Sequence, residues 1–354
     1  MPQNKQPKLV RISEKLQQNM QYVDELMGLE TNFDIIHRVI RLGDTDACMY
    51  LIDGFCKDEL MQKILQYLMD LKAEDFPKDA HEMSKIAIPY VEVDLDDTWE
   101  KILGALLSGV FVLLLDGYEK AVLIDARTYP TRGVEEPDTD KVLRGSKDGF
   151  VETVVFNTAL IRRRIRSTDL HMEMLNAGEN SRTDIVLCYM ESRVDPKLLT
   201  QIRERIRSIQ VDALAMNQES LAECLYQRKW YNPFPKFKYT ERPDTAEGNL
   251  VILVDNSPSA MILPTTIFDV VEEADDYYFP PVTGTYLRLT RFLIALLTYF
   301  VTPTYLLLMN HRMWIPENLE FIILKEDPNV PLILQFLLLE LAIDGLRLAA
   351  VNIC

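Results

Sequence analysis

The chain has 354 residues, of which 48% are hydrophobic, and its net charge is −16. This length predicts two or three domains with substantial apolar cores. The acidic charge excludes nucleic acid as a partner, because phosphate binding needs a basic surface, but it does not exclude a lipid bilayer, since acidic residues contribute little to helix orientation.

Residues 1–30 form a polar start and one amphipathic helix, in which Leu16, Met20, Val23 and Met27 repeat at helical spacing. Residues 31–131 are predicted to form a first small α/β subdomain. Its strands are expected at 31–41, 47–53, 90–93, 110–115 and 121–126, and its helices at 57–72 and 98–108. Asp97 is expected to cap the helix at 98–108.

Residues 132–166 are predicted to be a connecting loop followed, from about Asp148, by a basic helix. The helix ends in a run of arginines that includes Arg162, Arg163 and Arg164. Two interpretations of this run stand beside each other. It can be a solvated helix end, where cations oppose the negative end of the helix dipole. It can also be an ion-pairing seam to acids such as Glu135 and Glu136, or to a neighbouring subunit.

Residues 167–285 are predicted to form a second α/β subdomain of similar size. Its strands are expected at 170–175, 184–189, 213–216, 236–241, 249–255 and 260–263, and its helices at 196–208, 219–225 and 267–274. The similar size of the two subdomains raises the question of an internal duplication, although the sequence shows no aligned repeat.

Residues 286–354 are predicted to be membrane helices. Phe292–Met309 is a run of about 18 residues without a charge, close to the length that crosses a hydrocarbon core of about 30 Å. Arg288 and Arg291 precede this run and Arg312 follows it, where long cations can reach lipid headgroups. The alternative interpretation is a buried core helix of a soluble protein.

A second apolar run, at 331–351, carries Glu340, Asp344 and Arg347 on one helical face. Ionisable groups at membrane depth usually face a bundle interior or a water-filled path, so these three residues are candidates for a polar path through a membrane. The alternative is a helix that lies in the membrane interface with its charged stripe in water.

Catalytic and metal-binding patterns are missing from the sequence. The four histidines have no metal-ligand spacing, and there is no P-loop, GxGxxG or GxSxG motif. We therefore expect no catalytic residue, no metal and no cofactor. The five cysteines include no CxxC pair and the N-terminus has no apolar signal region, so we expect free thiols and a soluble part that stays in the cytosol.

The run EEPDTDKVLRGSKDGFVETVVFNTALIRRRIR at 135–166 resembles the GerA-type spore germination proteins, the family of the A subunits of nutrient germinant receptors. The resemblance continues through TDIVLCYMESRVDP, YTERPD, VDNSPSAMILPTT and GTYLRLTRFL, and it covers nearly the whole chain. It marks the following residues as family-motif positions with an expected role in assembly: Arg132, Glu135, Glu136, Pro137, Arg144, Gly145, Gly149, Phe150, Glu152, Asn157, Arg162, Arg163 and Arg164.

The resemblance implies two soluble α/β subdomains on the core side of the inner spore membrane, followed by membrane helices. It also implies a homo-oligomer around a pore, other membrane germination proteins as partners, and a role in ion release. Family members continue with more membrane helices, so the resemblance leads us to expect an incomplete membrane domain, in a fragment or a truncated form.

Three functions are therefore compared. The first is a component of an oligomeric ion-release channel complex in the spore membrane. The second is the A subunit of a nutrient germinant receptor that transmits ligand binding. The third is an α/β enzyme with a membrane anchor, which the absence of catalytic motifs makes the weakest.

Overall fold

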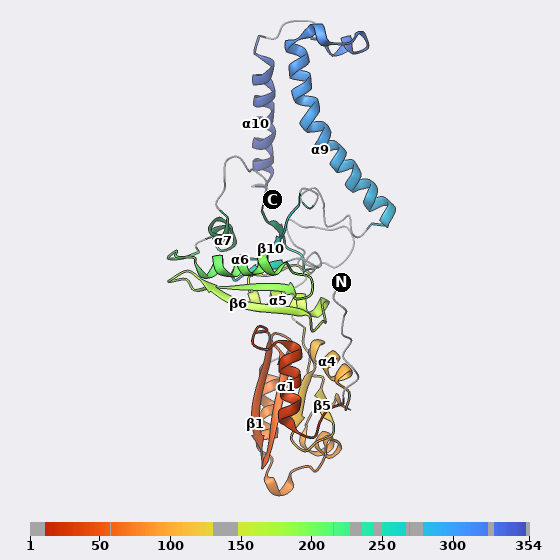
Figure 1. Cartoon of the computed structure of the whole chain (residues 1–354), viewed down its shortest axis with the longest axis vertical. Coiled ribbons are helices and arrows are strands. Elements are labelled where there is room, and N and C mark those ends of the chain that lie inside the picture. The colour runs from red at the N-terminus through yellow and green to blue at the C-terminus, as the bar shows by residue number, and fades with distance from the viewer. Residues whose placement is uncertain are drawn as a thin grey trace. The chain divides into compact units, whose positions relative to one another are not determined.

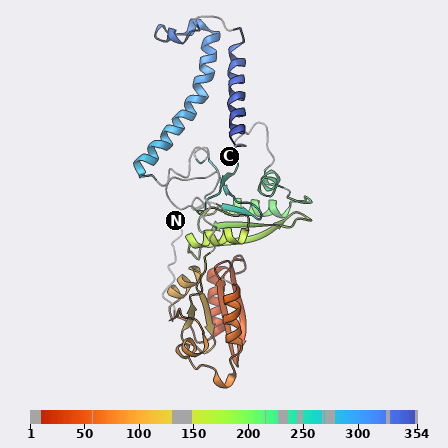
Figure 2. The same cartoon turned by 180° about the vertical axis from the view of Figure 1, so that it is seen from behind.

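The computed structural model describes residues 11–56, 58–129, 148–214, 216–226, 236–243, 250–266, 269, 279–324 and 329–351, with backbone only for 58 and 347–351. The chain divides into two compact units, Met1–Val270 and Val271–Cys354. Figures 1 and 2 show the elements of each unit from opposite sides. The first unit contains two five-stranded sheets with helices packed on them, which confirms the predicted pair of α/β subdomains.

The first subdomain is built around an antiparallel sheet with the strand order β1-β2-β4-β5-β3. Its elements in chain order are α1 (Leu16–Met27), β1 (Ile35–Leu42), β2 (Thr45–Ile52), α2 (Asp58–Met69), a 3-10 turn (Ala73–Asp75), α3 (Ala80–Glu82), a π-helical turn (Met83–Ala87), β3 (Val93–Asp96), α4 (Trp99–Leu107), β4 (Phe111–Leu115) and β5 (Ala121–Ile124).

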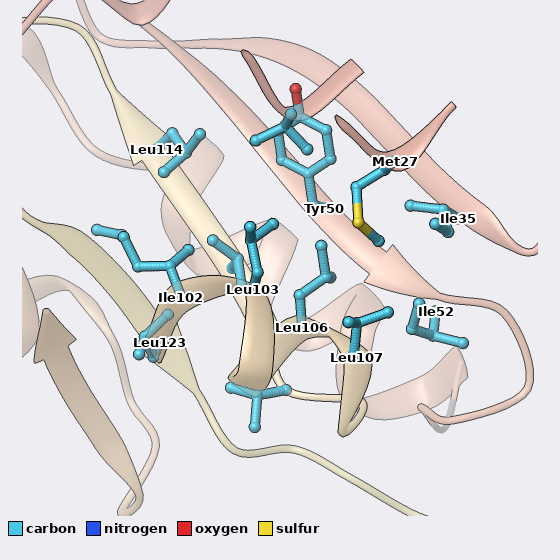
Figure 3. Close-up of a cluster of buried hydrophobic side chains, with 14 of the residues drawn as sticks. Met27, Ile35, Tyr50, Ile52, Ile102, Leu103, Leu106, Leu107, Leu114 and Leu123 are labelled. Atoms are coloured by element: carbon cyan, nitrogen blue, oxygen red, sulfur yellow. The ribbon is translucent and has the colours of Figure 1, made fainter. Parts of the chain in front are cut away.

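Helices cover both faces of this sheet. The apolar sides of α1 and α4 pack on one face, where Leu106 and Tyr50 belong to the same buried cluster (Figure 3). The buried side of α2, with Ile64 and Leu68, packs on the other face. All five residues of β4 are buried, as expected for a strand that is covered on both sides and therefore has no polar face.

The second subdomain repeats this architecture with the strand order β6-β7-β9-β10-β8. Helix α5 packs on one face of the sheet, and α6 and α7 pack on the other. Its elements in chain order are α5 (Val154–Arg164), β6 (Leu170–Ala177), β7 (Thr183–Met190), α6 (Pro196–Arg207), α7 (Gln218–Leu225), β8 (Lys238–Thr240), β9 (Leu250–Val254) and β10 (Ala260–Leu263).

The two subdomains also share local bonding at the start of their first helices. In α1, the amide of Asn19 bonds to both the N–H and the C=O of Ser13, at 2.8 and 2.6 Å. In α5, Asn157 bonds to the N–H and the C=O of Val151 at the same two distances. Asn19 and Asn157 each occupy the fourth position of their helix and are buried.

A second shared contact joins each helix start to a turn that follows a central strand. The Asp116 carboxylate, after β4, accepts the Leu16 N–H at 2.9 Å. The Asp255 carboxylate, after β9, accepts the Val154 N–H at 3.1 Å. Matched strand order, matched asparagine bonds and matched aspartate caps together show that the first unit is a structural duplication.

Some predicted element details were wrong. Helix α5 begins at Val154 rather than near Asp148, because the Asn157 side chain holds Val151 outside the helix. Asp97 is not the cap of α4; it pairs with Arg11 at 3.6 Å, while Asp96 accepts the Thr98 N–H.

The strand predicted at 213–216 is also absent from the described residues there. The Leu214 N–H instead donates to the Ser181 hydroxyl of the β6–β7 turn at 3.3 Å. Just before it, the backbone carbonyls of Val211 and Asp212 accept the N–H groups of Glu179 and Asn180 in the same turn. Their bonding is therefore satisfied outside the sheet. The helix predicted at 267–274 lies outside the described residues except for Asp269.

The second unit contains α9 (Pro281–Asn310), two 3-10 segments (Arg312–Trp314 and Glu317–Ile322) and α10 (Leu332–Val351). Helix α9 is long and apolar enough to cross a membrane, and none of its apolar window is buried in the structure. A core helix of a soluble protein would be mostly buried, so this observation favours the membrane interpretation. Tyr305 of α9 and Phe336 of α10 meet edge to face, with ring centroids 6.1 Å apart.

Candidate functional site

The two α/β subdomains meet at a polar junction, formed by residues 27–34 of the first and by α5 and the start of β6 of the second. Its centre is an ion pair between Arg162 and Asp34, whose side chains are 0% and 2% exposed. Arg162 Nε and Nη2 donate to the two Asp34 carboxylate oxygens at 2.7 and 3.0 Å. This bidentate geometry is the strongest form of a carboxylate–guanidinium contact.

Two further N–H donors of Arg162, both on Nη1, are also used. Its Nη1 donates to the carbonyls of Ser167 and Leu170, at 3.3 and 3.1 Å. A buried ion pair is tolerated only when further hydrogen bonds satisfy the charged groups, and that condition is met here. Arg162 therefore ties the first subdomain to the loop that leads into β6.

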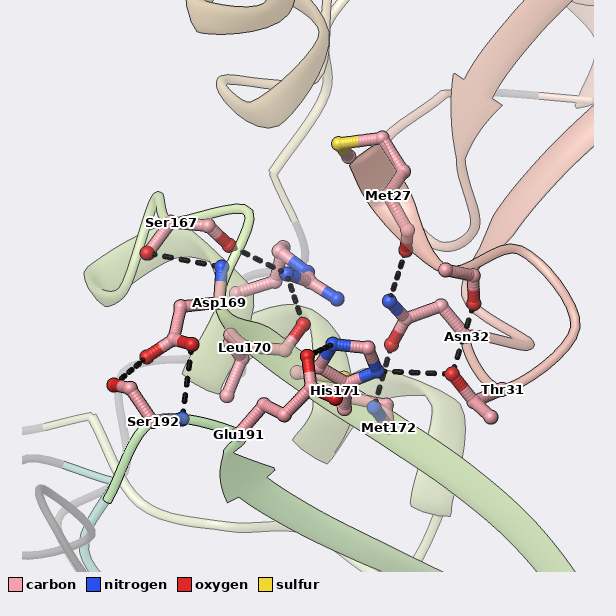
Figure 4. A network of polar contacts seen from close by, with 12 residues as sticks. Met27, Thr31, Asn32, Ser167, Asp169, Leu170, His171, Met172, Glu191 and Ser192 are labelled. Carbon is pink, nitrogen blue, oxygen red and sulfur yellow. Dashed lines mark hydrogen bonds and ion pairs between the residues drawn. The ribbon is translucent and has the colours of Figure 1, made fainter. Parts of the chain in front are cut away.

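Asn32 forms a second connection within the junction. Its Nδ2 donates to the Met27 carbonyl at 2.5 Å, and its Oδ1 accepts the Met172 N–H at 2.6 Å. The Phe33 N–H donates to the Met172 carbonyl at 3.2 Å. Main-chain groups of β6 are thus bonded to the α1–β1 loop, and Figure 4 shows the network.

His171 forms a third connection, beside Asn32 (Figure 4). Its Nδ1 lies 2.9 Å from the Thr31 hydroxyl, its Nε2 lies 3.2 Å from the Glu191 carboxylate, and its ring stacks on Tyr189. A Cβ on Gly28, whose φ is +56°, would approach the imidazole to 2.7 Å. Glycine at position 28 therefore permits both the left-handed turn after α1 and the close approach of His171.

Tyr129, just after β5, contacts the end of α5 at the edge of this junction. The Arg163 guanidinium lies over its ring, 4.5 Å from the centroid, and Arg166 Nη2 donates to its hydroxyl at 3.3 Å. Arg164 pairs with Asp148 at 3.4 Å. Arg162, Arg163 and Arg164 therefore have three different environments: a buried ion pair, a tyrosine ring and a partly exposed ion pair. The interpretation of this run as a solvated helix end does not fully describe any of them.

The family-motif residues divide into described and undescribed positions. Arg132, Glu135, Glu136, Pro137, Arg144 and Gly145 lie outside the described residues. Gly149 and Phe150 are buried, and the Phe150 N–H donates to the Glu241 carbonyl at 2.7 Å. Glu152 has an exposed side chain, and its carbonyl accepts the Asn256 N–H at 2.7 Å.

The candidate membrane residues lie on α10. Glu340 and Asp344 have exposed side chains, and the helix backbone continues through Arg347, whose side chain is not described. The apolar surface around them is exposed as well, including Leu337, Leu339 and Leu341. An apolar helix surface exposed around two acids requires either a membrane or partner helices to cover it.

Nucleophilic and metal chemistry have little support in the described residues. Burial raises the pKa of the Cys48 and Cys56 thiols to about 11 and also raises the pKa of the Cys188 thiol, so these groups stay protonated at neutral pH. Among the described residues, no group of three or more histidine, cysteine, aspartate or glutamate side chains is arranged to hold a metal ion.

Sequence reasoning identified Arg162 but missed its partner and the other junction residues: Thr31, Asn32, Asp34, Tyr129 and His171. Asp34 is 128 residues from Arg162, and no spacing rule connects them. A weak signal was available in Gly28, which directly follows an amphipathic helix and so marks a tight turn.

Two duplicated α/β subdomains, followed by a helix apolar enough to cross a membrane, define a class of two-part proteins with a folded polar unit and a membrane-type unit. A profile of the family described as Bacillus/Clostridium GerA spore germination protein matches residues 21–354. The chain therefore belongs to the GerA family of spore germination proteins, as its motifs predicted.

Individual relatives agree with this assignment. The chain is 37% identical to stage V sporulation protein AF of Bacillus subtilis, over 99% of this chain and 72% of that protein. It is 31% identical to spore germination protein A1 of the same organism, over 93% of this chain and 69% of that protein. It is 27% identical to spore germination protein KA of Bacillus subtilis, over 99% of this chain and 66% of that protein.

A solved structure is similar to the first unit. It is the N-terminal domain of the A subunit of the Bacillus megaterium spore germinant receptor GerK3. The TM-score is 0.56 at 26% sequence identity, and the match covers 73% of this chain and 98% of that domain. The predicted fold of the two subdomains is therefore confirmed by a related solved domain.

Proposed function

We propose that this protein is a component of an oligomeric ion-release channel complex in the inner spore membrane. The observation that carries the proposal is the 37% identity to stage V sporulation protein AF, against 31% and 27% to germination proteins A1 and KA. The exposed apolar surface of α9 supports a membrane location. The role is non-catalytic, consistent with protonated buried thiols.

In this proposal the first unit is a docking platform on the core side of the membrane. Its partners are further copies of the chain and other membrane germination proteins. The buried pair between Arg162 and Asp34 keeps the two α/β subdomains in a fixed arrangement, which a subunit interface built across both of them would need. The family-motif residues at 132–164 would serve this assembly by shaping the connection between the subdomains.

Helix α10 has the second role in the proposal. Glu340 and Asp344 are one turn apart on one face, and Arg347 follows on the same side of the helix. These charges face a polar path or pair with one another in the assembled complex, because isolated charges at membrane depth are costly. The alternative position, in the membrane interface, would leave the same charges in water.

The genetic test compares spores that lack the protein with wild-type spores of the same host. If the protein belongs to an ion-release complex, ion release should slow for every nutrient that triggers germination. Loss of the response to one nutrient alone would contradict the proposal and support a receptor subunit instead. Re-expression of the wild-type chain is the control for secondary effects of the deletion.

A reconstitution test asks whether the membrane helices of this chain take part in ion flux. Liposomes are prepared with a long relative such as stage V sporulation protein AF or with this 354-residue chain, and ion flux is recorded for each. Flux with both proteins would support a path that includes α9 and α10. In that case the triple variant Glu340→Gln, Asp344→Asn and Arg347→Gln should lower the flux, and unchanged flux would contradict the polar path.

The second candidate function is the A subunit of a nutrient germinant receptor. It is favoured by the similarity of the first unit to the GerK3 A-subunit domain, at a TM-score of 0.56. In that role the two α/β subdomains would transmit a signal from a ligand-binding partner subunit. The nutrient-specific outcome of the deletion experiment is the result that this alternative expects.

A further inference from the structure

Among the described residues, arginines outnumber their carboxylate partners at the end of α5. Five guanidinium groups lie there, on Arg127, Arg162, Arg163, Arg164 and Arg166. Three of them have carboxylate partners in the structure: Arg127 pairs with Asp125, Arg162 with Asp34 and Arg164 with Asp148. In a chain with a net charge of −16, a local excess of positive charge is unexpected and needs a physical reason.

The two remaining guanidiniums, on Arg163 and Arg166, have no carboxylate within ion-pair distance among the described residues. Both are held by Tyr129 instead. Arg163 stacks over the ring at 4.5 Å, and Arg166 donates to the hydroxyl at 3.3 Å and, through Nε, to the Arg163 carbonyl at 3.3 Å. Stacking on a ring face leaves the edge N–H donors of a guanidinium available.

The helix dipole does not balance these charges. The C-terminal end of a helix carries about half a negative charge, whereas Arg163 and Arg166 carry two positive charges. The Tyr129 hydroxyl cannot supply the remainder, because it is neutral. It donates to the Ser108 carbonyl at 2.9 Å and accepts from Arg127 at 3.3 Å as well as from Arg166.

We propose that Arg163 and Arg166, positioned by Tyr129, form a binding site for a small soluble oxyanion, either phosphate or a dicarboxylate. The guanidinium fork matches the oxygen geometry of both groups. The distant acidic residues of the chain do not prevent this, because salt screens exposed charges beyond about 8 Å at physiological ionic strength. The site joins the subdomains, since Tyr129 follows β5 and the arginines end α5.

The test is isothermal titration calorimetry on the full chain in a neutral detergent. Sodium phosphate and sodium malonate are titrated separately, each at an ionic strength matched with sodium chloride. Wild-type protein should bind at least one of the two anions. Arg163→Gln and Arg166→Gln should each weaken that binding by about tenfold or more, through loss of a charge-assisted contact.

The matched control is Arg41→Gln, which removes an exposed arginine on β1 and should leave the affinity unchanged. Arg163→Lys keeps the charge but loses the stacked fork, and it should give an intermediate affinity. If Arg163→Gln fails to fold, as judged by circular dichroism in sodium chloride solution, Arg163→Lys replaces it in the test. Equal affinity in wild type, Arg166→Gln and Arg163→Lys would overturn the proposal, as would no binding of either anion to wild type.

Discussion

Arg162 and Asp34 are 128 residues apart in the chain, yet they form a bidentate ion pair that is almost completely buried between the two α/β subdomains. In the duplicated architecture, Arg162 lies at the position of α5 that corresponds to Asp24 of α1, counted from the shared asparagine. The two copies therefore carry opposite charges at matching positions. In the first subdomain, the Asp24 carboxylate accepts a hydrogen bond from the Tyr50 hydroxyl of the same subdomain. In the second subdomain, Arg162 instead pairs with Asp34 of the neighbouring subdomain.

Replacing Asp34 by alanine should destabilise the first unit by about 3–5 kcal/mol, because Arg162 would remain buried without its counter-charge. The measurement is urea denaturation of the full chain, followed by circular dichroism. The double variant Asp34→Ala with Arg162→Met should recover part of the loss, since it removes the unpaired charge. If the single and double variants were equally unstable, the pair would not be the cause.

The matched control for this prediction is Asp97→Ala. It removes the carboxylate of an exposed pair with Arg11, at 3.6 Å, where the Arg11 side chain is 80% exposed. A surface pair of this kind contributes about 0–1 kcal/mol. Comparing Asp34→Ala with Asp97→Ala therefore shows how much of the lost stability is due to burial of the ion pair rather than to loss of an ion pair as such.

Asn19 and Asn157 should respond alike to substitution, because both bond to the N–H and C=O of the residue six positions earlier. Alanine at either position leaves partly buried backbone groups without their side-chain partner and should cost about 1–3 kcal/mol. Denaturation midpoints of the two variants provide the measurement. Gln21→Ala, on the exposed side of α1, should have almost no effect. A large effect of only one asparagine would argue against equivalent roles.

The pH dependence of stability should include a contribution from Asp96. Desolvation raises the pKa of this carboxyl, but hydrogen bonds from Thr98 and Lys101 outweigh it and lower the pKa from 3.8 to about 2. A carboxyl with a depressed pKa stabilises the fold above its unfolded-state pKa, and this stabilisation is lost as the pH falls from about 4 through 2.

Asp96→Asn should therefore lower the denaturation midpoint at pH 7 and have a much smaller effect near pH 2. Midpoints measured in steps between these values provide the curve. The control is Asp94→Asn, which changes an exposed carboxyl of the same strand. Equal losses at both pH values would show that the hydrogen bonds of Asp96 do not depend on its charge.

The fold was largely predictable because its elements have strong local patterns. The unbroken apolar run of β4 follows from burial of both of its faces, and the helical spacing of Leu16, Val23 and Met27 follows from burial of one side of α1. The family motifs also implied a pair of α/β subdomains followed by membrane helices. The division of the chain at 30, 131, 166 and 285 remains a prediction.

The junction was not predictable, because it depends on residue pairs that are distant in the sequence. The similar size of the two subdomains raised the question of a duplication, but the evidence for it lies in strand order and backbone hydrogen bonds. The two copies share Asn19 and Asn157 and the caps Asp116 and Asp255, but few neighbouring side chains. Four polar residues in otherwise different surroundings do not produce a visible repeat. Asp34 likewise has no local pattern that distinguishes it from a surface aspartate, since burial of its partner is decided by tertiary packing.

Leu296→Arg should prevent α9 from crossing a membrane, since an arginine at the centre of a membrane helix costs about 2.5–3.5 kcal/mol. Residue 296 lies at the middle of α9, whereas Val282 lies in its first turn, so Val282→Arg is the matched control. The readout is labelling of Met313→Cys, just after α9, by an impermeant maleimide in sealed vesicles, with Cys224 and Cys354 replaced by serine. Met313 is 95% exposed, so the introduced thiol should be reactive wherever water reaches it.

If α9 spans the bilayer, Leu296→Arg should move this thiol to the side of the first unit and change its labelling, whereas Val282→Arg should not. Identical labelling of wild type and Leu296→Arg would place α9 along the membrane surface rather than across it.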